Sequence, residues 1–470
     1  MADNTDRRPT ARGPTLLQAG RVGLFLLAGV WVILQNNARI GDSIPDHIGY
    51  SWLRIPRETR IVEAALLLAV FLVLQPLLAR SRLRDLNALL WILITAAVIG
   101  VLRMPTNLVA HFQGIYVYVA PFLIYSVAWE ASPDRRLLRC LITLFAAYLA
   151  LSVSVALLVQ FPEAGMKGDL IHGFFSDAHV LGSFLAIGSC VAFSRFLKAG
   201  GLGNLVLSGF LFFVSLFPVN EKAIIFNVIW YAVVLARRLI SHPRGRRGLV
   251  TAAAACVLAL GLTLGRRDDS EPLTRIDLLF ARSVSELGPA RAWVLSWHAI
   301  SDSPVDLTIG LGPANFAGLA AQRTVQEQQG RLGTFRRSAR DVLADEPGAG
   351  GAMDLVANTW SNLLAEFGLI GFGAFALALI RVSLPLYRWR PAAPFDRLVR
   401  SAFLVMLSVI VWQGCFTPYT NWADPVLVYP MMVLAAYCHR AMPRRSPVTR
   451  LQASRNMSKW QPCPAMERPL

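Results

Sequence analysis

The sequence predicts an all-α, polytopic membrane protein, and three observations carry this prediction. Of the 470 residues, 55% are hydrophobic and only 16% are charged, whereas soluble domains average about 25% charged residues. Apolar runs recur along the whole chain, and at about 20 residues each is long enough to span the hydrocarbon core of a bilayer as a helix. The runs are continuous and do not alternate with polar residues, which argues against a β-barrel.

The apolar runs predict about twelve transmembrane helices, interrupted by one long polar insert. The insert, residues 265–357, has no apolar run long enough to cross a bilayer and lies between the ninth and tenth spans. The chain therefore divides into a tail at 1–20, nine spans within 21–264, the insert, three spans within 358–440 and a tail at 441–470. The expected spans lie near 16–35, 61–79, 86–102, 108–129, 137–159, 178–197, 202–219, 223–237, 248–265, 358–380, 399–416 and 425–440.

Arginine and lysine concentrate in every second short loop, which predicts the orientation of the chain. Cytoplasmic loops carry an excess of these residues, so both termini are expected in the cytoplasm and the insert outside. The net charge of +17 comes largely from these loops, and nucleic-acid binding is therefore not expected. The loops contain Arg80, Arg82, Arg84, Arg135, Arg136, Arg139, Arg195, Lys198, Arg237, Arg238, Arg381, Arg388, Arg390, Arg397, Arg400, Arg440, Arg444 and Arg445.

The six cysteines form no paired motif and lie mostly inside apolar runs, where they act as small hydrophobic residues. His172, Asp177 and His179 are the closest approach to a metal-ligand set. No second acidic cluster accompanies them, and divalent cations favour carboxylate-rich or multi-histidine sites. Neither a metal nor another cofactor is expected.

The outer end of a membrane hairpin carries Glu221 and Lys222. These residues have two interpretations. They can form a Glu–Lys pair or extend toward the interface without further function. They can also serve a site, because they lie on the same expected face of the membrane as the insert.

Arg291 opens an expected amphipathic helix over 289–301, which Ser303 and Pro304 end. An arginine here is either an exposed loop residue or a phosphate clamp, since a guanidinium binds phosphate oxygens in a bidentate manner. His298 is two helical turns further on and shares a face with Arg291. The following Gly-Leu-Gly-Pro segment, 310–313, lacks the context of a nucleotide loop and predicts a sharp turn.

Glu366 falls about eight residues into the tenth span, at a depth of roughly 12 Å. A carboxyl group at that depth is expected to be protonated or paired, through a neighbouring helix or within a site. Gly368, Gly371 and Gly373 in the same span suit close helix packing.

In their order along the chain, four segments resemble the superfamily of O-antigen ligases and O-antigen polymerases. They are 173–179, the Glu221–Lys222 hairpin, 291–316 and 358–371, and the resemblance covers about residues 60–440. It implies a GT-C-like, metal-independent, inverting glycosyltransferase of the bacterial inner membrane, working at the periplasmic face. The implied donor is a polyprenyl-diphosphate-linked (undecaprenyl-type) glycan, and the acceptor is a glycan or lipid-linked glycan. O-antigen, capsule or exopolysaccharide synthesis, with chain-length regulator and flippase proteins as partners, is the implied context.

The resemblance also implies roles for individual residues. Arg291 and Lys222 would grip the diphosphate, Lys222 standing where the family often has Ser-Arg. Ala357 occupies the position where the family usually has a histidine, which leaves His179, His172, His298 or Glu221 as the base, or leaving-group stabilisation alone. This absence favours a polymerase over a ligase. The residues implied to contact substrate are His172, Asp177, His298, Asn315, Asn358 and Glu366. A transporter or flippase for lipid-linked glycan and a non-catalytic envelope scaffold remain alternatives.

Overall fold

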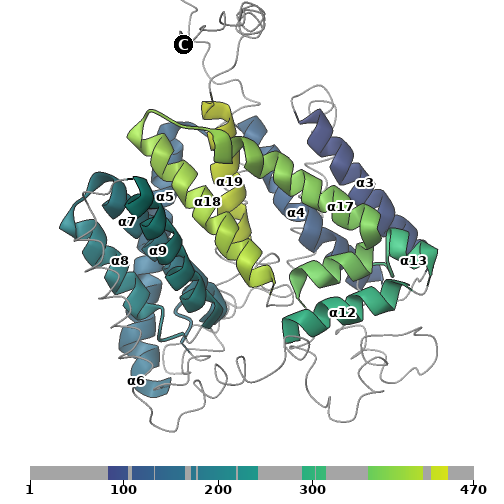
Figure 1. Cartoon of the computed structure of the whole chain (residues 1–470), viewed down its shortest axis with the longest axis horizontal. Helices are drawn as coiled ribbons and strands as arrows, with labels where there is room; N and C mark the ends of the chain where they lie inside the picture. The colour runs from purple at the N-terminus through teal and green to yellow at the C-terminus, as the bar shows by residue number, and fades with distance from the viewer. Residues whose placement is uncertain are drawn as a thin grey trace, which may run out of the picture.

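The structure is a computed structural model, which describes residues 83–103, 108–131, 133–164, 171–175, 178–218, 221–241, 288–301, 303–313, 358–415 and 425–442. This part of the chain is helical, with turns between helices and no strands (Figure 1). Within it, five helices are long and apolar enough to cross a membrane: Arg84–Arg103, Gly114–Ala131, Arg135–Gln160, Ala178–Ala199 and Thr359–Arg388. Their length and composition indicate a helical membrane protein.

The described helices account for most of the expected spans. Three expected spans, near 16–35, 61–79 and 248–265, lie outside the described residues, and the count of twelve therefore stays a prediction. All other expected spans overlap described helices. In chain order the described helices are α3 (Arg84–Arg103), α4 (Leu108–Ala131), α5 (Arg135–Val155) continued by the π-helix η4 (Ala156–Gln160) and α6 (Phe161–Ala164), α7 (Ala178–Ala199), α8 (Leu202–Val214), α9 (Glu221–Ser241), α12 (Gly288–Ser301), α13 (Pro304–Ile309), α17 (Thr359–Arg388), α18 (Pro394–Gly414) and α19 (Pro425–Ala441).

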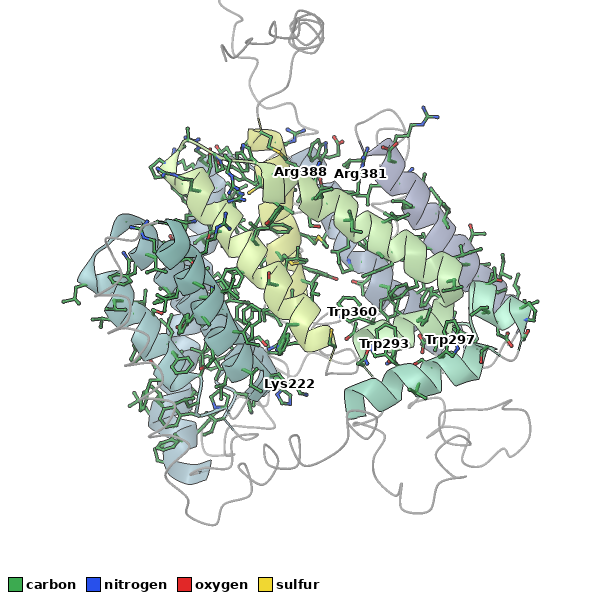
Figure 2. The ribbon with its side chains drawn as sticks, viewed as in Figure 1. Lys222, Trp293, Trp297, Trp360, Arg381 and Arg388 are labelled. Carbon is green, nitrogen blue, oxygen red and sulfur yellow. The ribbon has the colours of Figure 1, made fainter. Side chains whose placement is uncertain are left out.

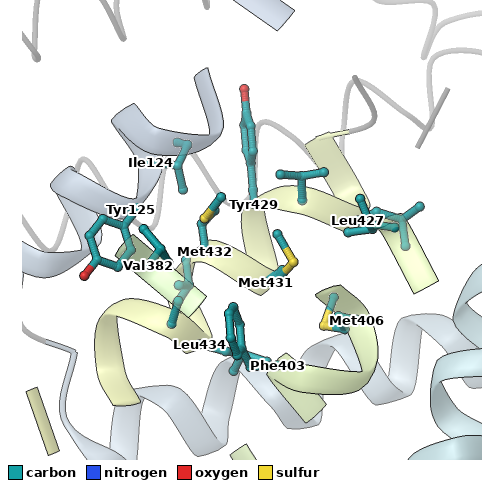
Figure 3. Close-up of a cluster of buried hydrophobic side chains, with 14 of the residues drawn as sticks. Ile124, Tyr125, Val382, Phe403, Met406, Leu427, Tyr429, Met431, Met432 and Leu434 are labelled. Atoms are coloured by element: carbon teal, nitrogen blue, oxygen red, sulfur yellow. The ribbon is translucent and has the colours of Figure 1, made fainter. Parts of the chain in front are cut away.

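The long helices form two packed groups joined through α18 and α19. Helices α7, α8 and α9 pack together on one side, while α3 packs on α17 and α4 packs on α19 on the other. Helix α18 contacts both α7 and α19 and so joins the groups (Figure 1). A buried apolar cluster fills the joint, as Figure 3 shows for Phe403 and Met406 of α18 beside Met431 and Leu434 of α19.

Two expectations for single spans were wrong in detail. The span expected over 202–219 is a helix only as far as Val214, and a turn over 215–218 follows. The Ser215 hydroxyl donates to the Phe212 carbonyl at 2.6 Å, a local bond that competes with continued helix. The span expected over 358–380 is helical to Arg388, but its backbone leaves helical geometry at Gly368.

A buried polar network joins α5, α18 and α19. Asp396 lies in the first turn of α18, and its side chain is only 8% exposed. Its Oδ2 accepts from Arg135 Nη2 at 2.8 Å, and its Oδ1 accepts from the Tyr437 hydroxyl at 2.8 Å. Arg135 Nε also donates to the Tyr437 oxygen at 3.2 Å. The carboxylate thus ties α5 to two helices, α18 and α19, that come more than 200 residues later in the chain.

Replacing Asp396 by alanine is expected to lower the melting temperature of the purified protein by about 3–8 °C, because the buried Tyr437 hydroxyl and the Arg135 guanidinium lose their shared acceptor. The matched control is Asp85→Ala, which breaks the pair between Arg381 and an Asp85 side chain that is 62% exposed. An exposed pair contributes little, and the control is expected to shift the melting temperature by less than about 2 °C. Thermal unfolding is measured by tryptophan fluorescence in detergent. Equal shifts in melting temperature for the two variants would contradict a stabilising role of the Asp396 network.

Candidate functional site

The candidate site is built around the break in α17. Before the break lies a nine-residue segment over 359–367, here called the half-helix. Gly368 has φ 62° and ψ −171°, a conformation that L side chains rarely adopt. A continuous helix would pair the carbonyls of Ala365 and Glu366 with amides four residues later. Here Leu311 N–H donates to the Ala365 oxygen and Gly312 N–H to the Glu366 oxygen, both at 2.9 Å. The turn after α13 therefore satisfies the polar groups that the break exposes.

Two glycines allow this contact between backbones. A Cβ on Gly310, whose φ is 79°, would lie 2.5 Å from the Glu366 carbonyl carbon and carbonyl oxygen. A Cβ on Gly368 would overlap the Gly310 nitrogen and would lie 2.6 Å from the Ile309 nitrogen. The sharp turn predicted over 310–313 is confirmed, and its glycines make a close crossing. A Cβ on Gly371 would lie 3.5 Å from Leu93 of α3, as expected of a glycine at a helix contact, whereas nothing lies within 4 Å of a Cβ on Gly373.

The ends of α3 and α4 hold the turn in place. Arg103 Nη2 lies 2.8 Å from Asp306 Oδ1 in α13, and Arg103 Nη1 donates to the Gly310 carbonyl at 3.4 Å. The buried His111 bonds through Nδ1 to the Pro313 carbonyl. Since α13 begins at its N-cap Ser303 directly after α12, this end of the insert is fixed to the helix bundle.

The half-helix is buried along its whole length, although it carries several polar side chains. Asn358 is its N-cap, and its side chain accepts from Ser361 N–H at 2.8 Å. The Tyr118 hydroxyl donates to the Thr359 carbonyl at 3.3 Å. Glu366, 2% exposed, lies within electrostatic range of Tyr118. A nine-residue helix with a buried N-terminus and a buried carboxyl group is unusual in a membrane span.

The last turn of α18 joins the half-helix to Lys222. Trp412 Nε1 donates to the Lys222 carbonyl at 3.0 Å, which fixes the first turn of α9. On the other side of the same turn, Trp360 Nε1 donates to the Val411 carbonyl at 3.1 Å. A Cβ on Gly414 would lie 2.8 Å from the Trp360 ring, so the indole covers this glycine. Figure 2 shows Lys222, Trp293 and Trp360 at the same end of the bundle.

His179 reaches the same region through α7. It lies in the first turn of α7 and is half-buried, as is Lys222. One turn later, the Ser183 hydroxyl lies 2.6 Å from the His179 carbonyl oxygen. The same hydroxyl lies 2.8 Å from Gln413 Oε1, to which it can donate a hydrogen bond. The structure thus brings the N-terminal ends of α7 and α9, which carry His179 and Lys222, to the same last turn of α18 as the half-helix.

Other predicted site residues are placed less directly. Arg291 and His298 belong to α12, which packs on α17 with Trp293 edge-on to Phe372 at 6.3 Å between centroids. The side chains of Arg291 and His298 lie outside the description, as does that of Glu221, the first residue of α9.

His172 lies in a turn at the end of α5. Its backbone N–H donates to Gln160 Oε1 at 2.9 Å, and that of Gly173 donates to the same oxygen at 2.8 Å. Asp177 and Asn315 lie outside the described residues. Within the described residues, no group of three or more His, Cys, Asp or Glu side chains is placed to hold a metal ion.

Sequence reasoning missed the residues that join the site. Ser183 and Gln413 are fully buried, and Trp412 and Trp360 donate across helices. The available signal was a glutamine inside an apolar run at 399–416, because an amide at membrane depth needs a partner. That signal identifies Gln413 but does not name its partner.

Comparisons of the chain with protein-family models, with curated proteins and with solved structures found no match. Its function is therefore argued from the arrangement of the site and from the residues that carry the sequence resemblance.

Proposed function

We propose that this protein is an inverting membrane glycosyltransferase that uses a polyprenyl-diphosphate-linked glycan as donor and extends a polysaccharide. The observation that carries the proposal is the meeting of three predicted elements at one end of the bundle. Lys222 and the His179 turn contact one side of the last turn of α18, and the half-helix contacts the other. Helix α12, which carries Arg291, packs on α17.

The proposed reaction needs few protein groups, and the segments that carry the candidate residues are at this end of the bundle. An acceptor hydroxyl oxygen forms a bond to the anomeric carbon of the donor. The bond between that carbon and the diphosphate oxygen breaks, and its electron pair leaves with the lipid diphosphate. Cations at Lys222 and Arg291 would stabilise the developing charge on the leaving group. His179 is the candidate base for the proton of the acceptor hydroxyl.

Two further points fit a polymerase at the outer face. Ala357 supplies no base directly before the half-helix, which favours extension of a lipid-linked chain over transfer by a histidine-dependent ligase. Among the described basic residues, Arg381 and Arg388 lie at the end of the bundle opposite Lys222 (Figure 2), which supports an extracytoplasmic position for Lys222 under the positive-inside rule.

Transport of lipid-linked glycan is the second candidate function, because a helix broken at membrane depth is a recurring feature of transporters. In transporters the unwound carbonyls face the substrate or ion. Here the carbonyls of Ala365 and Glu366 accept from Leu311 and Gly312. The carbonyls at the break therefore bind the turn after α13 and not a substrate or ion. This favours a glycosyltransferase over a transporter.

The test is the activity of an Arg291→Ala variant. Full-length protein is reconstituted in liposomes with polyprenyl-diphosphate repeat units, and product length is followed by gel electrophoresis. The variant is expected to lose about 10- to 100-fold in rate of extension, and Arg291→Lys is expected to recover only part of it because the bidentate fork is lost. Long chains at the normal rate and protein level would overturn the proposal. Donor movement across liposomes that contain no acceptor would instead support transport.

A further inference from the structure

The end of the bundle opposite Lys222 carries a second concentration of charge. Lys198 is near the end of α7, Arg237 is in the last part of α9, and Arg390 lies between α17 and α18. Arg397 and Arg400 are in the first two turns of α18. We call these five residues the basic cluster. Helices α7, α9 and α18 pack on one another, and Figure 2 shows nitrogen atoms gathered at their upper ends. Four chain segments therefore bring cations to one place.

Four members of the cluster have no ion-pair partner in the described part of the chain, namely Lys198, Arg390, Arg397 and Arg400. Arg237, Arg390, Arg397 and Arg400 all act electrostatically on the Lys198 ammonium group. The ion pairs found among the described residues involve Arg103, Arg135 and Arg381, and none involves Lys198, Arg390, Arg397 or Arg400. Asp396, beside Arg397, is already bound by Arg135 and Tyr437. Like charges so placed repel one another, and an anion bound among them would remove that repulsion.

Arg400 is held in a fixed orientation within the cluster. Its Nε donates to the Leu386 carbonyl at 2.8 Å, and its Nη2 donates to the Tyr387 carbonyl at 2.7 Å. A guanidinium has five N–H donors, so three remain after these two bonds. The last turn of α17 thereby fixes the plane of a group that is well suited to phosphate oxygens.

An exposed apolar stripe leads along α17 to the same point. Leu377, Ile380, Leu384 and Tyr387 are 55%, 50%, 39% and 60% exposed. Their spacing of three, four and three residues places them on one face of the helix. The stripe ends at Tyr387, whose carbonyl binds Arg400. A hydrocarbon chain lying on this face would bring its polar end to the basic cluster.

We propose that the basic cluster binds the phosphate headgroup of an anionic phospholipid, whose acyl chains lie along the α17 stripe. Basic loops set topology in any polytopic protein. Two features go beyond that role, namely the convergence of cations from four segments and the apolar stripe that ends at Arg400. Basic sites between transmembrane helices are suited to anionic lipid headgroups. This site is independent of the proposed glycosyltransferase site.

The experiment measures phospholipid binding to the full-length chain by native mass spectrometry. Titration with dioleoyl phosphatidylglycerol is compared with titration with dioleoyl phosphatidylcholine. The test variant is Arg390→Gln/Arg397→Gln, which removes two exposed cations and keeps Arg400. The matched control is Arg84→Gln/Arg136→Gln, which removes two exposed arginines that begin α3 and α5. We expect about 25-fold weaker phosphatidylglycerol binding for the test variant at low salt, and a change of less than about 2-fold for the control.

Two results would overturn the proposal. Equal weakening in the two variants would mean that diffuse charge, and not the cluster, attracts the lipid. Competition by dihexanoyl phosphatidylglycerol or inorganic phosphate as strong as that by the dioleoyl lipid would mean that the site takes a free anion and makes no use of the stripe. The second measurement uses the unaltered chain, so it holds whether or not the variants fold.

Discussion

Alanine at Gly368 is expected to prevent the protein from reaching its folded state in detergent, or to destabilise it by about 4 kcal/mol or more. Three effects act together. The residue has φ 62°, which disfavours any Cβ. The added Cβ would overlap backbone atoms of Gly310 and Ile309, and backbone cannot move aside as a flexible side chain can. If α17 straightened instead, the amides of Leu311 and Gly312 would lose their acceptors.

The matched control for this variant is Gly373→Ala, one and a half turns further along the same helix. A Cβ there meets nothing within 4 Å, and alanine favours helix over glycine by up to about 1 kcal/mol. Melting temperature and the monodisperse fraction in size-exclusion chromatography are compared. The close crossing is wrong if Gly368→Ala and Gly373→Ala proteins melt within about 2 °C of each other.

Lys222→Ala is expected to reduce the extension rate by about 100- to 1,000-fold, the effect of removing a group that stabilises transition-state charge. The loss should not come from unfolding. The bond that fixes this turn runs from Trp412 Nε1 to the Lys222 backbone carbonyl, and any residue at position 222 supplies that carbonyl. The side chain can therefore be changed without removing the bond.

The comparison variant is Lys222→Arg, which keeps the charge and is expected to retain at least about a tenth of the rate. Arg136→Ala, an exposed cation at the start of α5, should leave the rate unchanged. The measurement is product length against time in liposomes, at equal protein level. Full activity in the Lys222→Ala protein would exclude this lysine from the site, and a similar loss with arginine would mean that shape matters there more than charge.

Hydropathy predicted much of the helical framework, because a span must be apolar and about 20 residues long whatever surrounds it. The amphipathic pattern over 289–301 predicted α12, because Ser303 and Pro304 mark a local boundary that needs no tertiary contact. The break at Gly368 had no such local mark. Within an apolar run a glycine is equally compatible with close helix packing, and the conformation depends on amides more than 50 residues earlier in the chain.

The candidate site was predictable as a set of segments but not as an arrangement. Charge in an apolar hairpin pointed to Lys222, and a carboxyl group at membrane depth pointed to Glu366. The meeting of Lys222 with Trp412 joins positions 190 residues apart, and nothing in either neighbourhood specifies the other. The same holds for Ser183 and Gln413, which are 230 residues apart. A polar residue in an apolar run indicates that it has a hydrogen-bond partner, but the identity of that partner depends on how the helices pack.

The crossing of Gly310 and Gly368 has a mechanical consequence. Two backbone hydrogen bonds and a contact without intervening side chains leave the turn after α13 no freedom to slide on the half-helix. Arg103 and His111 anchor that turn from the other side. A movement of α13 is therefore expected to move the Glu366 backbone with it. The position of the half-helix at the polar end of the bundle therefore depends on the position of α13.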